Sequence, residues 1–189
     1  MKRLFIDVET GGIDPNIHSL LTVGLVVADG EKIVDRLELG IKHKTFNVTQ
    51  EAMKVNNIDL KDLTTSPEDS FLIIDAFLKR NFDRKINIGG HNIGFDISFF
   101  KPFYESVREY LKSLNPNIDI PTWNQRFDYH YVDTSIIATY LKECGKLKVS
   151  SVSLGKLIEY FNLQAESRHT AMEDAMMSAL VYHRLKKLI

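Results

Sequence analysis

The sequence is poor in cysteine and has no long uninterrupted run of apolar residues. Its one cysteine, Cys144, excludes an intramolecular disulfide and cannot supply a zinc cluster. The longest apolar stretch, residues 20–28, is broken by Thr22 and Gly24. It is far shorter than the roughly 20 residues that a membrane-spanning helix needs. We therefore expect a protein of a reducing compartment that has no membrane span.

Neither sign of charge is in excess. The chain has 24 Lys and Arg against 25 Asp and Glu, a formal net charge of −1. A protein that coats long nucleic acid relies on many basic contacts to phosphates, so this balance argues against that class. An enzyme that holds one short end is not excluded, because acids gathered at a metal site would offset basic residues around them.

The first residues resemble the opening of a signal peptide but do not continue as one. Met1–Ile6 combine two basic residues with apolar ones, yet Asp7 and Glu9 interrupt the run before an apolar region can form. We therefore expect a cytoplasmic protein. The length of 189 residues and the hydrophobic content of 44% fit one compact domain, residues 1–189.

The apolar periodicity predicts a series of short strands followed by alternating helices and strands. Asp29-Gly30 is a strong hairpin signal, and the segment after it alternates apolar residues at Ile33, Leu37 and Leu39. Ser66 before Pro67 is typical of a helix start. Strands are expected over residues 3–8, 20–28, 32–39, 86–90 and 131–133, helices over 49–55, 66–78, 95–114, 135–142, 153–161 and 171–188, and an irregular loop over 115–129. This order predicts an α/β fold with a central mixed five-stranded sheet, an antiparallel meander plus parallel strands, flanked by helices.

Two acids interrupt the first expected strand. Side chains alternate between the faces of a strand, so Asp7 and Glu9 point to one face while Val8 points to the other. Like charges this close raise each other's pKa unless a cation neutralises them, and carboxylates are the ligands that hard divalent metals prefer. The alternatives are a metal site and a solvated strand edge.

A second candidate segment, His91-Asn92-Ile93-Gly94-Phe95-Asp96, follows a strand that ends in glycines and opens a helix. Ligands in α/β folds bind at such loops. Asp96 is either a further carboxylate for the site or a partner of the helix dipole. His91 and Asn92 either contact substrate or hold the loop through hydrogen bonds.

A third segment places a histidine just before a helix. Thr170 and Glu173 have the spacing of a capping box, which predicts a helix that begins at Ala171. Asp174 then lies in the first turns and His169 on the preceding loop. A loop histidine with a pKa of about 6.5 is suited to accept a proton from water near neutral pH. The alternatives are a dipole partner at Asp174 and an exposed loop residue at His169.

Together the three segments resemble a known family. Asp7-Val8-Glu9-Thr10, the segment from His91 to Asp96 and the segment from His169 to Asp174 are similar, in order and spacing, to the three motifs of the DEDDh, or DnaQ-like, 3′ to 5′ exonucleases. The resemblance spans most of the chain. It implies a ribonuclease H-like fold.

The resemblance also implies the chemistry of the site. Two divalent ions, Mg²⁺ or in its place Mn²⁺, would be held by Asp7, Glu9, Asp96 and Asp174, with His169 as the base. The backbone near Thr10 and Gly11 would receive the terminal nucleotide, and Ile13 would wedge against its base. His91 and Asn92 are the other residues expected to touch substrate. Aromatic side chains at Phe99, Phe100 and Trp123 either stack on bases or belong to the core.

The resemblance leaves the substrate open. The expected products are nucleoside 5′-monophosphates released from the 3′ end of DNA or RNA, in proofreading, repair or RNA turnover. The partners considered are a single-stranded nucleic acid end, a polymerase or other replication protein, and a second copy of the chain. The alternatives are a ribonuclease H-type endonuclease and a noncatalytic nucleic-acid-binding subunit with the same fold.

Overall fold

The fold is built around one mixed sheet. The computed structural model describes residues 2–164 and 170–189. The strands in these residues are β1 (Lys2–Thr10), β2 (Leu20–Asp29), β3 (Lys32–Gly40), β4 (Ile88–Gly90) and β5 (Val132–Asp133). They form a five-stranded sheet in the order β3-β2-β1-β4-β5, in which β1, β2 and β3 are antiparallel and β4 and β5 run parallel to β1. The expected fold class is confirmed.

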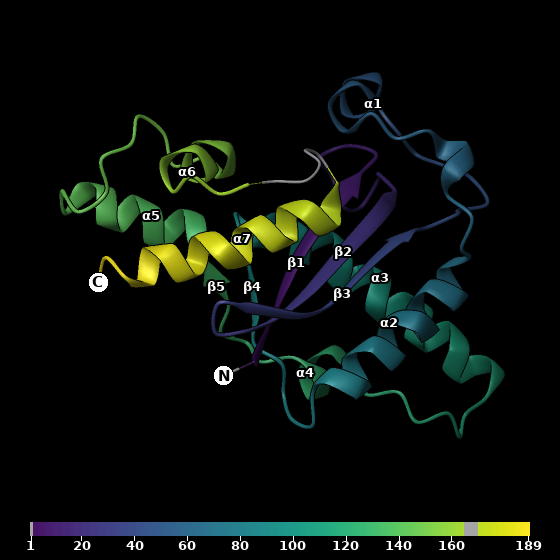
Figure 1. Ribbon diagram of the computed structural model, residues 1–189. Coiled ribbons are helices and arrows are strands. Elements are labelled where there is room, and N and C mark those ends of the chain that lie inside the picture. The colour runs from purple at the N-terminus through teal and green to yellow at the C-terminus, as the bar shows by residue number, and fades with distance from the viewer. Residues whose placement is uncertain (1, 165–169) are drawn as a thin grey trace.

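Helices cover both faces of this sheet (Figure 1). The helices in the described residues are α1 (Gln50–Asn56), α2 (Pro67–Asn81), α3 (Ile93–Leu114), α4 (Trp123–Arg126), α5 (Thr134–Glu143), α6 (Leu154–Tyr160) and α7 (Ala171–Lys186), with a 3₁₀ turn at Leu60–Asp62. Helices α2 and α3 pack on one face, and α7 crosses the other, over β1 and β2. Within the described residues no helix is both long and apolar enough to cross a bilayer.

Alternate side chains of β1 pack into two different hydrophobic clusters, one on each face of the sheet. Leu4, Ile6 and Val8 belong to the large core under α2 and α3, whereas Phe5 packs in a smaller cluster with Ala175 and other residues of α7. Asp7 and Glu9 share the parity of Phe5, so their side chains lie on the α7 face. The central strand thus places its two acids beneath the helix that carries Asp174.

The predicted hairpin is present, but its register changes once. Gly30 adopts a positive φ of 61°, which glycine tolerates without steric cost, and β3 follows at Lys32. A bulge between Val27 and Ala28 inserts one extra residue into β3. As a result Ile33 packs on the α7 side, whereas Leu37 and Leu39 pack on the α2–α3 side. The apolar residues of β3 are therefore divided between the two faces of the sheet.

The expectation of an irregular loop over residues 115–129 was partly wrong. Thr122 and Gln125 form a reciprocal capping box that starts α4 at Trp123, and Phe127 makes a parallel bridge with Ile86. The Trp123 ring packs against Phe100 and Phe127 at centroid distances of 5.7 and 4.1 Å. The segment is polar on average, but two of its large aromatic residues, Trp123 and Phe127, are buried in the core.

Candidate active site

Three carboxylates meet at the carboxyl end of β1. Thr170 caps α7 by accepting a hydrogen bond from the Glu173 N–H at 3.3 Å, so the helix begins at Ala171 as expected and Asp174 lies in its first turn. One oxygen each from Asp7, Glu9 and Asp174 lies within 4.8 Å of the others. We call these three residues the carboxylate cluster. Figure 1 shows why they meet: β1 ends beside the first turn of α7.

Asp96 lies beside this cluster but is bound to the backbone of β1. It is 4% exposed in the first turn of α3, and its Oδ1 accepts a hydrogen bond from the Val8 N–H at 2.9 Å. That N–H belongs to the residue between Asp7 and Glu9. Asp96 is therefore a neighbour of both acids and a support for the strand that carries them, and its role as a metal ligand stays a prediction.

Burial and mutual repulsion hold these acids toward their neutral forms. Burial raises the pKa of Asp7 well above its ordinary value, and the charges of Asp96, Asp174 and Glu9 raise it further. Burial, followed by Asp174 and Glu38, raises the pKa of Glu9 to about 7. Burial raises the pKa of Asp96 to about 8, although hydrogen bonds from the Val8 N–H and from its own backbone oppose the shift.

This arrangement fits a hard divalent cation. Among the described residues, no lysine or arginine forms a salt bridge with Asp7 or Glu9. The Thr22 hydroxyl, on the β2 residue paired with Glu9, is buried and has no hydrogen-bond partner within the described part of the chain. A positive charge bound by carboxylate oxygens would remove the repulsion and allow Asp7 and Glu9 to ionise.

The raised pKa values predict how stability changes with pH in the absence of metal. Because Glu9 and Asp96 hold protons up to about pH 7 and 8 in the folded state but only to about pH 4 when unfolded, the folded state binds more protons. Stability is therefore lost as the pH rises. His91 and His183, whose pKa values burial lowers, act in the opposite direction only below about pH 6.5.

We therefore expect the melting temperature in EDTA to fall between pH 6.5 and 8.5. The fall should be at least about 3 °C, the change that 1 kcal/mol produces in a chain of this length. Differential scanning fluorimetry with EDTA or with Mg²⁺ at each pH is the measurement. Mg²⁺ should stabilise the protein more at pH 8.5 than at pH 6.5. A metal-free melting temperature that rises through this range would contradict the assignment.

The segment expected to receive a nucleotide is tied down internally. The Thr10 hydroxyl donates to the Gly12 carbonyl at 2.6 Å, and the Thr10 carbonyl accepts from Asn56 Nδ2 at 3.1 Å. The Gly11 N–H donates to the Ser19 carbonyl, and the Gly11 carbonyl accepts from the Thr49 N–H. Since the polar backbone groups of Gly11 already have partners, the segment is held rigidly rather than left open.

An apolar pocket lies directly beside Glu9. It has a volume of about 510 Å³ and is bounded by Val8, Glu9, Thr10, Gly12, Ile13, His18, Thr49, Glu51, Ala52, Val55, Asn56 and Phe95. Ile13 is 86% exposed and Val55 77% exposed, so two apolar side chains stand in solvent at its rim. A pocket of this volume is in the range of about 300–1,000 Å³ that is typical of sites for small ligands. Ile13 thus lines the pocket, and its contact with a base stays a prediction.

His91 makes structural hydrogen bonds. The Thr134 hydroxyl donates to the Gly90 carbonyl at 3.1 Å, so its oxygen is left to accept a hydrogen bond from His91 Nδ1 at 2.9 Å. Burial lowers the pKa of His91, which favours this neutral ring. Asn92 caps α3 in the left-handed region at φ 59°, and its backbone N–H donates to Asp133 Oδ1 at 3.0 Å. Both residues hold the loop before Asp96, and substrate contact stays a prediction.

Two predictions remain to be compared with the structure: His169 as the base, and the aromatic residues as a surface on which bases stack. His169 lies outside the described residues, so its expected role as the base stays a prediction. The aromatic residues Phe99, Phe100 and Trp123 are 4%, 0% and 2% exposed and belong to the large core. They do not offer a face for bases to stack on, and the core interpretation is confirmed.

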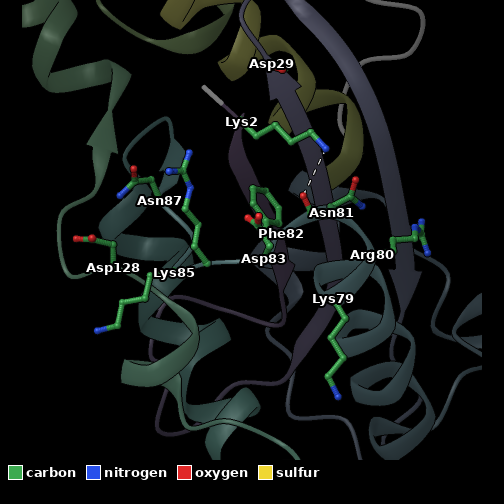
Figure 2. A pocket seen from close by; sticks show the side chains of 11 residues that line it. Lys2, Asp29, Lys79, Arg80, Asn81, Phe82, Asp83, Lys85, Asn87 and Asp128 are labelled. Atoms are coloured by element: carbon green, nitrogen blue, oxygen red, sulfur yellow. Dashed lines mark hydrogen bonds between the residues drawn. The ribbon is translucent and has the colours of Figure 1, made fainter.

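A larger pocket lies at the opposite end of β1 (Figure 2). It has a volume of about 780 Å³, and basic residues line much of it. Lys2 Nζ donates to the Asn81 carbonyl at 3.5 Å, Arg80 is paired with Asp35, and Lys79 is paired with Asp75. The side chains of Lys79, Arg80 and Lys85 point in different directions (Figure 2). They do not converge on a common ligand.

Sequence reasoning missed Glu38 and Asn56. Glu38 lies on β3 across Gly24 from Asp7, it raises the pKa of Glu9, and its Oε1 accepts a long hydrogen bond of 3.4 Å from the Met172 N–H. Asn56 is buried at the end of α1 and bonds to Thr10. No local signal marks either residue. Glu38 reaches the site only because of the register shift in β3.

Comparison with known sequences identifies the family. The sequence profile of a family described as "Exonuclease" matches residues 4–182. The PolC-type DNA polymerase III of Thermotoga maritima is 25% identical over 184 residues, which are 97% of this chain and 12% of that protein. The same polymerase of Thermotoga petrophila is 24% identical over a stretch of equal length. The chain thus spans about one eighth of these relatives.

Solved structures share the fold. Escherichia coli exonuclease I in complex with a dT13 oligonucleotide superposes with a TM-score of 0.75 at 16% identity, covering 98% of this chain and 41% of that one. The zinc-bound form of the exonuclease I complex with single-stranded DNA gives a TM-score of 0.74, also at 16% identity, over 99% and 42% of the two chains. The family profile covers nearly all of the present sequence, and the fold agrees with it. The chain therefore belongs to the exonuclease family, among the DnaQ-like 3′ to 5′ exonucleases.

Proposed function

We propose that this chain hydrolyses the last phosphodiester bond at the 3′ end of a nucleic acid, depends on two divalent metal ions, and releases nucleoside 5′-monophosphates. The observation that carries the proposal is the carboxylate cluster, with one oxygen from each member within 4.8 Å of the others, next to an apolar pocket. The family profile and the fold support the reaction class.

Asp7, Glu9 and Asp174 are the residues that would hold the ions, with Asp96 as the fourth ligand. When bound, Mg²⁺ ions lower the pKa of a water molecule and stabilise the charge that develops on the leaving oxygen. Asp96 would also have a second role, because the hydrogen bond that it accepts from the Val8 N–H fixes the backbone between Asp7 and Glu9. His169, which directly precedes Thr170 in the sequence, would accept the proton of the attacking water.

The terminal base would enter the apolar pocket. Ile13 at its rim would press against the base, while Val55 and Phe95 form other parts of the wall. Thr10 and Gly11, held by hydrogen bonds to Asn56, Ser19 and Thr49, would keep the terminal nucleotide at a fixed distance from Glu9. This pocket favours removal of a terminal nucleotide over the internal cleavage of a ribonuclease H-type endonuclease.

Single-stranded DNA is the substrate that the neighbours support best. The exonuclease I structures contain oligonucleotides such as dT13, and the PolC-type relatives are DNA polymerases. We propose a place in DNA replication or repair, with a polymerase or another replication protein as the partner. Cytoplasmic location and an arrangement of residues 1–189 as one domain belong to the same proposal.

The direction of hydrolysis can be tested with labelled strands. The purified protein with Mg²⁺ or Mn²⁺ should shorten 5′-labelled single-stranded DNA one nucleotide at a time, and a 3′-blocked strand should be degraded much more slowly. Duplex DNA and RNA of the same sequence distinguish the substrate classes. Circular single-stranded DNA is the control and should stay intact. Cleavage of the circle, or equal rates on free and blocked ends, would favour an endonuclease and overturn the proposal.

A further inference from the structure

Gly24 occupies a central place beneath the candidate site. It lies on β2, where it pairs with Asp7 of β1 on one side and with Glu38 of β3 on the other. Residues paired across neighbouring strands point to the same face, so the missing side chain of Gly24 leaves a gap between two acids. That face is the one crossed by α7.

The first turn of α7 fills this gap with backbone. A Cβ atom at Gly24 would lie 2.2 Å from the carbonyl carbon of Ala171 and 2.2 Å from the backbone nitrogen of Met172. Real Cβ atoms essentially never come within 3.0 Å of a heavy atom outside their own residue and its two chain neighbours. Because the clash is with backbone, no rotamer change of a neighbour relieves it. Any larger residue at this position must displace the start of the helix.

Displacement of the helix start would move a predicted metal ligand. Asp174 follows Met172 by two residues in the same turn, and its oxygen lies within 4.8 Å of oxygens from Asp7 and Glu9. We propose that Gly24 is a positioning residue for metal binding, because its lack of a side chain lets α7 carry Asp174 to the two acids of β1. The inference rests on the proposed function for the identity of the metal site.

Glu38 contributes to the same placement from the other side of Gly24. Its Oε1 accepts a hydrogen bond of 3.4 Å from the Met172 N–H, which is one of the unpaired donors at the start of α7. Glu38 thus holds the first turn at the point where Gly24 allows it to approach.

The test measures metal binding directly, apart from activity. Isothermal titration of Mn²⁺ into the G24A variant should give an affinity about 10- to 100-fold weaker than in the natural protein, the range typical of residues that orient metal ligands. Far-UV circular dichroism and the melting temperature in EDTA report whether the variant is folded.

V26A is the matched control. Val26 is a buried residue of β2 on the same face beneath α7, two residues from Gly24, but it lies in the cluster with Ala175 and Ala179 farther along the helix. Its truncation should lower the melting temperature and leave Mn²⁺ affinity within about twofold, because the helix start does not move. Equal loss of affinity in both variants would show a general effect of stability and overturn the proposal.

A second pair of variants decides the matter if G24A does not fold. E38A removes the acceptor for the Met172 N–H and should weaken Mn²⁺ binding about fivefold, whereas E38Q keeps an acceptor oxygen and should weaken it less. Equal losses in E38A and E38Q would assign the effect to charge and overturn the positioning role.

The outcomes separate this inference from the proposed function. If G24A binds Mn²⁺ as well as the natural protein, and the natural protein degrades DNA, the positioning role is wrong and the function stands. If the natural protein binds Mn²⁺ but degrades no nucleic acid, weaker binding by G24A still supports the positioning role.

Discussion

Replacing Asp7 by asparagine is expected to slow hydrolysis of a 3′-terminal nucleotide by more than about 1,000-fold. Metal ions contribute several kcal/mol of transition-state stabilisation, and each 1.36 kcal/mol corresponds to about a factor of ten in rate. Asp7 is the member of the carboxylate cluster that Asp96, Asp174 and Glu9 all perturb, so it lies at the centre of the charges. Single-turnover rates on a 5′-labelled strand measure the loss.

The same substitution should make the metal-free protein more stable. Burial and three neighbouring acids raise the pKa of Asp7 well above its ordinary value, so the carboxyl group is costly to the folded state near neutral pH. Asparagine has nearly the same shape and no charge. We expect the melting temperature in EDTA at pH 8 to rise, and the further rise on adding Mg²⁺ to shrink.

D83N is the matched control for D7N. Asp83 lines the pocket at the opposite end of β1, so its neutralisation should change neither the rate nor the response to Mg²⁺. Loss of activity together with a lower melting temperature in D7N would mean that Asp7 supports the fold. Undiminished hydrolysis by D7N would place the catalytic site elsewhere.

Replacing Trp123 by alanine is expected to cost about 3–5 kcal/mol of folding stability, the range for truncation of a buried aromatic side chain. The indole is 2% exposed and packs against Phe100, Tyr104 and Phe127. For a chain of this length the loss corresponds to a fall in melting temperature of about 10 °C. Thermal unfolding measures it, and W123F should lose much less.

Activity measurements on the same variant address the alternative role of Trp123. The rate per folded molecule and the KM for single-stranded DNA should be unchanged at a temperature where W123A stays folded. Y129A, which removes an aromatic ring that is 78% exposed, is the control for nonspecific effects and should hardly change stability. A raised KM with an unchanged melting temperature in W123A would show that the ring contacts bases after all.

Local patterns predicted the elements that carry the site. The alternation that puts Asp7 and Glu9 on one face of β1 depends only on strand geometry, and the structure confirms it. The Thr170 cap likewise fixed where α7 begins and hence where Asp174 lies. Both predictions rest on interactions between residues a few positions apart, for which the sequence contains the needed information.

Such local patterns could not predict which residues of distant segments come into contact. The two-residue turn Gly30-Glu31, continued without a bulge, would pair Gly24 with Leu37, but the bulge after Val27 pairs it with Glu38 and turns this acid toward α7. The position of Asp96 against the Val8 N–H also depends on how α3 packs across the end of the sheet. These contacts join distant segments, and no spacing in the sequence encodes them.

The docking of α7 over β1 determines when the site can come into existence. Asp7 and Glu9 precede Asp174 by most of the length of the domain, so they are synthesised well before it. Because the helix start must settle on Gly24 before the three oxygens meet, a growing chain on the ribosome has two of the carboxylates long before it has the third. At about 5–20 residues per second, roughly 10 to 30 seconds separate these events. The carboxylate cluster is therefore completed only after α7 has been synthesised and has docked on β1 and β2.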